Sequence, residues 1–193
     1  MVNFTSNTYQ MKREILSFSN KISKHLSKPD KKFSADMTYG MLAAGSCLLT
    51  DVVEQLHEDT KKVNSVERLT RHLNNGTSFT ALKSYLTAIR KWAPQEPVIH
   101  IDDSDVVKPD GYKFEALGLV RDGSKSTASK TVYEKGYHVT EACVLTKNNH
   151  PVSIFSKIHS SKEKNFTSNN DVTFSAMERG AALFGKATFA MDR

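Results

Sequence analysis

Cysteine is scarce in this sequence: the only two, Cys47 and Cys143, lie far apart and form no motif. A disulfide framework or a cysteine-based metal site is therefore not expected, and a reducing, cytoplasmic setting is favoured. Long apolar runs are also missing, since none approaches the roughly 18 residues of a membrane-spanning helix. The first residues lack the charged-then-apolar order of a signal peptide. We therefore expect no membrane partner.

Acidic and basic residues are unevenly spread along the chain. The net charge of +6 comes from residues 1–95, which hold 14 Lys and Arg against 8 Asp and Glu, whereas residues 96–193 hold 13 of each. A basic half joined to a neutral half with acid clusters is typical of a polyanion-binding part and a chemical part. The alternative is a protein whose surface simply happens to be basic. The apolar content of 38% in 193 residues predicts a folded chain, with one ordinary domain or two small ones.

Residues 1–95 are expected to form a helical domain. Apolar residues recur at helical spacing over residues 9–27, and Ser34 and Ser65 are expected to cap two later helices. A Gly-containing interruption between two of the helices outlines a helix-turn-helix, although any pair of antiparallel helices gives the same pattern. The stiff segment Pro94–Pro97 is the expected boundary.

Residues 96–193 are expected to contain strands, one helix and a final strand, in the order β-β-β-α-β. A short β-branched run after Pro97 predicts a first strand that stops at an acid cluster. Two alternating segments joined by a turn predict an antiparallel hairpin. Asp171 and Gly185 are expected to cap the helix, which leads into the last strand. The expected strands cover 98–101, 136–146, 152–158 and 187–191.

Asp102 and Asp192 each follow a short apolar run that predicts a strand. A helix between the two runs can return the chain parallel to the first strand. Parallel neighbours lie about 4.8 Å apart, so both carboxylates would then reach one divalent cation, for which oxygen ligands are preferred. A solvated acidic turn after an ordinary strand is the alternative interpretation.

Several segments together resemble the DDE transposases of bacterial insertion sequences, over most of the chain. Asp102-Asp103-Ser104 fits the pattern around the first acid, and Gly136–Glu141 is similar to the second strand of the family. Residues 103–109, 114–115 and 120–124 look like the block between them, and Asp192-Arg193 matches the start of an Asp-Arg-Gly motif around the second acid.

The resemblance implies a helical DNA-binding domain at 1–95, followed at 96–193 by the first half of a ribonuclease H-like mixed sheet. It implies DNA transposition, in which transposon ends are cleaved and joined to target DNA by an in-line displacement at phosphorus with two Mg²⁺ or Mn²⁺ ions. Double-stranded DNA would be the partner, with a homodimer on the DNA and a nucleoid-associated cytoplasmic location.

The site residues follow from the resemblance. Asp102 and Asp192 are the expected catalytic metal ligands. Asp103 is the second choice for the first acid, because neighbours on a strand point to opposite faces, and Asp105 either assists from a loop or is an ordinary solvated acid. The candidates for contact with the DNA backbone are Lys12, Arg13, Arg68, Arg71, Lys108, Arg121, Lys125 and Lys130.

The chain departs from the family in one respect. The third acid of the family is a Glu on a later helix, and this sequence ends at Arg193. We therefore expect a truncated transposase that is inactive alone. The alternative function is a non-catalytic DNA-binding fragment that occupies transposon ends. If an acid inside the chain replaces the missing one, Glu141, Glu163 and Glu178 are the first candidates.

Overall fold

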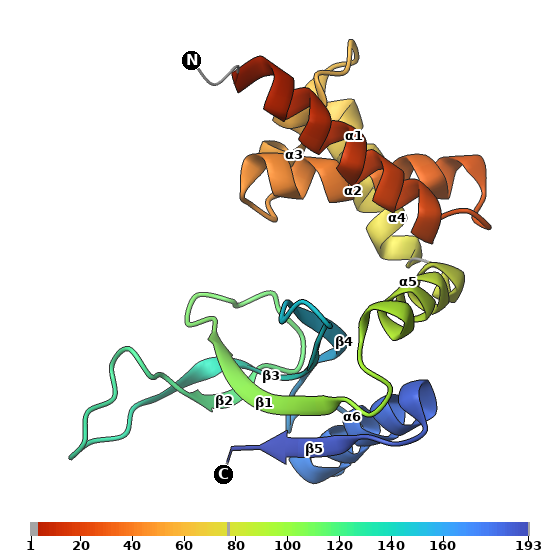
Figure 1. Ribbon diagram of the computed structural model, residues 1–193. Helices are drawn as coiled ribbons and strands as arrows, with labels where there is room; N and C mark the ends of the chain where they lie inside the picture. Colours follow the sequence, from red (N-terminus) through yellow and green to blue (C-terminus); the bar gives the residue numbers. More distant parts are fainter. Residues whose placement is uncertain (1–3, 77, 193) are drawn as a thin grey trace. The chain divides into compact units, whose positions relative to one another are not determined.

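The computed structural model describes residues 4–76 and 78–192 (Figure 1). It divides into two compact units, Met1–Thr87 and Ala88–Arg193, so the division falls inside a helix, whereas the sequence analysis placed the boundary at Pro94–Pro97. Over the described residues the protein is α+β, with six helices and a mixed five-stranded sheet. None of the described helices is long and apolar enough to span a membrane.

The first unit is built from helices, as predicted. Ser27 begins the second helix by accepting a hydrogen bond from the Asp30 amide, and Gly45 ends it in the left-handed conformation. Ser34 and Ser65 lie inside helices, so the prediction that they are caps is wrong. The helices are α1 (Phe4–Ile22), α2 (Lys28–Ala44), α3 (Leu49–Leu56), α4 (Lys62–Asn75) and α5 (Phe79–Trp92), which continues into the second unit.

Helices α2, α3 and α4 share a small core made by Phe33, Val52, Val53 and Leu69. Gly40 permits the close packing of α2 on α3, because a Cβ atom there would lie 2.5 Å from Val52 Cγ1.

The second unit is a sheet covered by one helix. Strand β3 pairs with β1, β2 and β4, all antiparallel, and β5 pairs with β1 in parallel. A one-residue irregularity interrupts the β3–β4 register next to Ala142 and Cys143. The elements are β1 (Val98–Val107), β2 (Gly118–Arg121), β3 (Tyr133–Leu145), β4 (Pro151–His159), α6 (Asn169–Phe184) and β5 (Thr188–Met191).

The structure confirms the β3–β4 hairpin and the parallel β1–β5 pair that the sequence predicts. Two predictions are wrong. Strand β1 does not stop at Ile101 but continues to Val107, because β3 is long enough to pair with it over this whole length. Helix α6 is capped by Ser168, whose hydroxyl accepts from the Asp171 amide, and not by Asp171 itself. The short strand β2 is not predicted.

Helix α6 packs on one face of the sheet (Figure 1). Gly180 makes this close approach possible, since a Cβ atom there would lie 2.5 Å from Ile99 Cδ1 and 3.0 Å from Phe189 Cε1. Ile99 and Ile101 are buried under the helix, so residues of the same parity in β1 belong to the α6 face. The α6 face is therefore apolar at the start of β1.

Candidate active site

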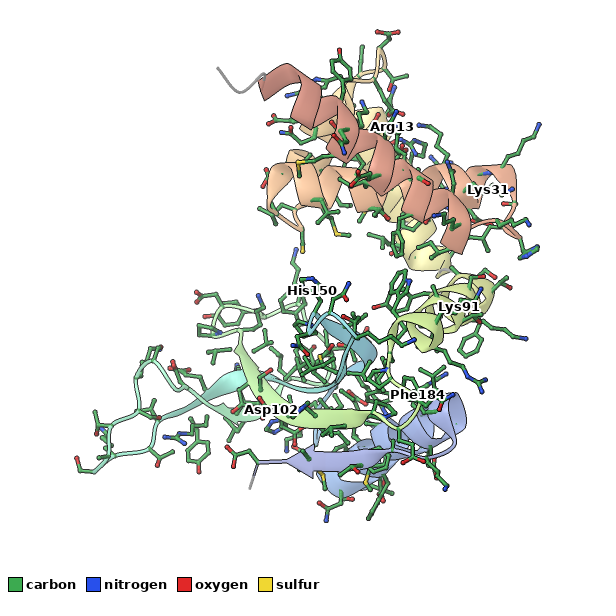
Figure 2. The ribbon with its side chains drawn as sticks, in the orientation of Figure 1. Arg13, Lys31, Lys91, Asp102, His150 and Phe184 are labelled. Atoms are coloured by element: carbon green, nitrogen blue, oxygen red, sulfur yellow. The ribbon has the colours of Figure 1, made fainter. Side chains whose placement is uncertain are left out.

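A pocket of about 760 Å³ lies where β5 stops and β1 continues. Among the described residues, β5 pairs with β1 only from Val98–Thr188 to Ile101–Met191. Asp102, Asp103 and Asp192 line the pocket, together with Arg121 of β2 and residues near the N-terminus of α6. Figure 2 shows Asp102 on β1. The register therefore brings the expected acids to one site, although β1 itself does not end there.

Asp102 and Asp103 differ in what holds their carboxylates. Asp103 shares the parity of Ile99 and Ile101, and its Oδ1 atom accepts a hydrogen bond of 2.5 Å from the hydroxyl of Thr140, directly opposite on β3. The Oδ1 atom of Asp102 accepts only from the neighbouring Asp103 amide, at 3.0 Å, among the hydrogen bonds of the described chain. Asp103 is thus held by another strand, and Asp102 is held locally.

Asp105 lies within β1, so the expectation that it sits in a loop is wrong, whereas the residue is exposed, as the alternative of a solvated acid expects. Its Oδ1 atom lies 2.6 Å from Nδ1 of His138, and its Oδ2 atom accepts from the Arg121 amide at 3.2 Å. Its side chain alone is 25% exposed. These contacts tie β1 to β2 and β3, so Asp105 stabilises the sheet beside the pocket.

Two residues near the site, Thr140 and His159, were missed by the sequence analysis. Both are fully buried, and the Thr140 hydroxyl lies 2.9 Å from His159 Nε2. Burial, with a further effect from the neighbouring His138, lowers the pKa of the His159 imidazole below its ordinary value. The sequence signal that could have found Thr140 is its position in β3. It lies on the same face of the strand as the buried residues Ala142 and Val144, at a spacing of two residues.

The basic candidates fall into two groups. Arg68 forms ion pairs with Asp36 (2.8 Å) and Glu58 (3.0 Å), and Lys125 pairs with Glu134 (2.9 Å). The charges of Arg68 and Lys125 are thus paired with acids of their own unit. Arg13, Arg71, Lys108, Arg121 and Lys130 are exposed, and the Lys12 ammonium lies over the Tyr39 ring.

The basic residues of α1 form a continuous surface. Lys12, Arg13, Lys21 and Lys24 line one shallow hollow along the exposed side of this helix. Figure 2 shows Arg13 on α1. Three cations on α1 and Lys24 in the turn after it, without an acidic side chain among the described residues that line the hollow, suit a polyanion better than a small ligand.

The carboxylates at the pocket suit one hard divalent cation. Mg²⁺ is commonly held by one or two carboxylates, while water and substrate phosphates complete its octahedron, and the pocket offers carboxylates from two strands. Within the described residues, however, no group of three or more His, Cys, Asp or Glu side chains is arranged to hold a metal ion. Glu141, Glu163 and Glu178 are not among the described residues that line the pocket. The carboxylate oxygens that the described pocket could offer to a cation are therefore those of Asp102, Asp103 and Asp192.

Comparison with known proteins adds no family assignment: no protein-family model matches the chain, and no curated protein matches it.

Proposed function

We propose that this chain is a DDE-type transposase component, in which a helical unit binds DNA and a ribonuclease H-like sheet supplies acids for metal-dependent phosphoryl transfer. The observation that carries the proposal is the parallel β1–β5 pair. Its register from Val98–Thr188 to Ile101–Met191 ends at a pocket that Asp102, Asp103 and Asp192 line. The strand order β4-β3-β1-β5, with α6 as the crossover helix, supports the same assignment.

The residues of the pocket have distinct roles in this proposal. Asp192 and one of the two adjacent acids, Asp102 or Asp103, hold a divalent ion. When bound, Mg²⁺ would activate a water or a DNA 3′-hydroxyl, and a second ion would be needed to stabilise the charge on the leaving oxygen. Arg121 lines the same pocket, where its guanidinium is suited to bind a DNA phosphate in bidentate geometry. In this proposal the residues of the chain position the metal ion and the DNA phosphate and supply the charges that bind them.

The helical unit contributes DNA affinity in this proposal. The cations along α1 would contact phosphates and release condensed counterions. A second candidate function is a DNA-binding fragment without catalysis, which is favoured by the lack of a three-ligand metal group among the described residues. Metal binding at the pocket separates the two functions, because only the first requires it.

Titration with Mn²⁺, followed by the electron paramagnetic resonance signal of the free ion, tests the proposal. We expect one ion per chain in the wild type. Asp192→Asn should weaken binding by at least about tenfold, the smallest loss commonly seen even for outer-shell partners of a metal ligand. Asp102→Asn and Asp103→Asn identify which adjacent acid is the ligand.

The matched control is Asp110→Asn, an exposed acid of the same unit that does not line the pocket. It should bind Mn²⁺ as the wild type does. If the wild type binds no Mn²⁺, or if Asp110→Asn weakens binding as much as Asp192→Asn, the metal-dependent function is refuted and the non-catalytic DNA-binding function remains.

A further inference from the structure

A hydrogen-bonded chain leads from the exposed Asp103 at the pocket to two buried residues of the sheet. It runs from Asp103 Oδ1 to the Thr140 hydroxyl at 2.5 Å, and from that hydroxyl to His159 Nε2 at 2.9 Å. Thr140 is 0% exposed and His159 is 1% exposed. The three residues come from β1, β3 and β4, so the chain crosses three adjacent strands.

Hydrogen-bond capacity fixes the direction of this chain. An ionised carboxylate can only accept, and a hydroxyl has a single proton to donate. Thr140 must therefore donate to Asp103, which leaves its lone pairs for His159. His159 must then carry its proton on Nε2 and donate it to Thr140. The Nδ1 atom of a neutral His159 is left as an acceptor, and it has no hydrogen-bond partner among the described residues.

The position of the His159 ring is itself fixed by packing. His159 lies opposite His138 in the β3–β4 register, and the two ring centroids are 5.7 Å apart. The Phe166 ring stacks on His159 at 6.0 Å, with an interplanar angle of 9°. Burial lowers the pKa of His159, which favours the neutral imidazole and so leaves the unpartnered Nδ1 atom without a proton. The packed His159 ring therefore holds its Nε2–H group in place to donate to the Thr140 hydroxyl.

We propose that Thr140 and His159 are positioning residues that hold the Asp103 carboxylate in its metal-binding orientation, an inference that rests on the function proposed above. Asp103 is then the preorganised member of the adjacent pair, since the hydrogen bond of Asp102 comes only from its neighbour. Metal ligands depend on such partners: replacing an outer-shell group commonly costs about 10–100-fold in affinity.

The experiment compares Thr140→Val and Thr140→Ser in the whole chain. Valine keeps the size of threonine but removes the proton that Asp103 accepts, whereas serine keeps the hydroxyl. We expect Thr140→Val to weaken Mn²⁺ binding about 10–100-fold and Thr140→Ser to restore it close to the wild-type value. His159→Phe keeps a ring against Phe166 but removes the donor, and its affinity should fall between these two.

A second measurement does not depend on metal. Nitrogen-15 NMR of the histidine side chains should show His159 as the Nε2–H tautomer, with a slowly exchanging proton that Thr140→Val makes exchange faster. Circular dichroism of each variant checks that it is folded.

The outcomes separate the inference from the proposed function. If the wild type binds Mn²⁺ and folded Thr140→Val binds it equally well, the positioning role is overturned and the proposed function stands. An Nδ1–H tautomer of His159 also overturns the inference. If the wild type binds no Mn²⁺, the proposed function fails, and with it the role in metal positioning, even where NMR confirms the hydrogen-bonded chain.

Discussion

Glu58 should make the stability of the helical unit depend on acid pH. It is the centre of an ion-pair cluster, where it accepts hydrogen bonds from Lys32 (2.5 Å), Ser65 (2.6 Å) and Arg68 (3.0 Å). These donors, with Lys32 the largest contributor, lower the pKa of the Glu58 carboxyl from 4.5 to about 2. The folded state therefore favours the ionised form.

The sign and size of the effect follow from this pKa. Because the pKa is lower in the folded state than in the unfolded state, the stabilisation is complete above about pH 4.5 and is lost as the pH falls toward 2. The full difference corresponds to at most about 3 kcal/mol. The Lys32 side chain is 53% exposed, so solvent screening reduces the expected contribution to about 1–2 kcal/mol.

The test is the variant Glu58→Gln, studied by urea unfolding with far-ultraviolet circular dichroism at pH 7 and at pH 3. At pH 7 we expect a loss of about 1–2 kcal/mol, because neutral hydrogen bonds replace charge-assisted ones. The loss should shrink at pH 3. Glu67→Gln, an exposed carboxyl on the same helix α4, should change the stability by less than about 0.5 kcal/mol. An equal loss at both pH values, or no loss at pH 7, would refute the reasoning.

Three further predictions concern DNA, packing and catalysis. Arg13→Glu should weaken DNA binding at low salt and flatten its salt dependence, as measured by fluorescence anisotropy, because a phosphate contact is lost; an unchanged salt slope would count against the basic surface of α1. Gly180→Ala should lower the free energy of unfolding by about 1–3 kcal/mol, since the new methyl group would lie 2.5 Å from Ile99 Cδ1. Gly123→Ala, where the methyl group meets no atom within 4 Å, is the control in the same urea titration. The chain alone should not cleave transposon-end DNA with Mg²⁺ or Mn²⁺, since the reaction uses two ions and no group of three or more His, Cys, Asp or Glu among the described residues is arranged to hold a metal ion; robust cleavage that Asp102→Ala abolishes would contradict this.

Local patterns were sufficient to predict most of the elements. The helices of the first unit and the β3–β4 hairpin follow from apolar periodicity, which is a property of neighbouring residues. The cap of α6 was misplaced because Ser168 and Asp171 are both good cap residues within one turn. Strand β2 has only four residues, Gly-Leu-Val-Arg, and apolar and polar residues do not alternate clearly in its sequence. Only its pairing with β3 identifies it as a strand.

The acids of the candidate site were predicted, but their surroundings were not. Asp102 and Asp192 could be placed together because the β1–β5 pairing follows from the crossover helix. The predicted length of β1 was too short, because the acids Asp102, Asp103 and Asp105 suggest a turn after Ile101. Pairing with the long strand β3 keeps these acids in β1. The hydrogen bond from Thr140 to Asp103 joins residues far apart in the sequence, and no local pattern encodes such a contact.

The uneven described lengths of β1 and β5 have a consequence for the charge along β1. Past Ile101 the edge of β1 is no longer paired with β5 in the described structure, and an open strand edge is a template for another polypeptide. The adjacent carboxylates of Asp102 and Asp103 place negative charge at that edge, which repels an identical edge from a second molecule. A divalent ion bound at the pocket would neutralise this charge. Ion binding would therefore lower the electrostatic repulsion between two such segments of β1.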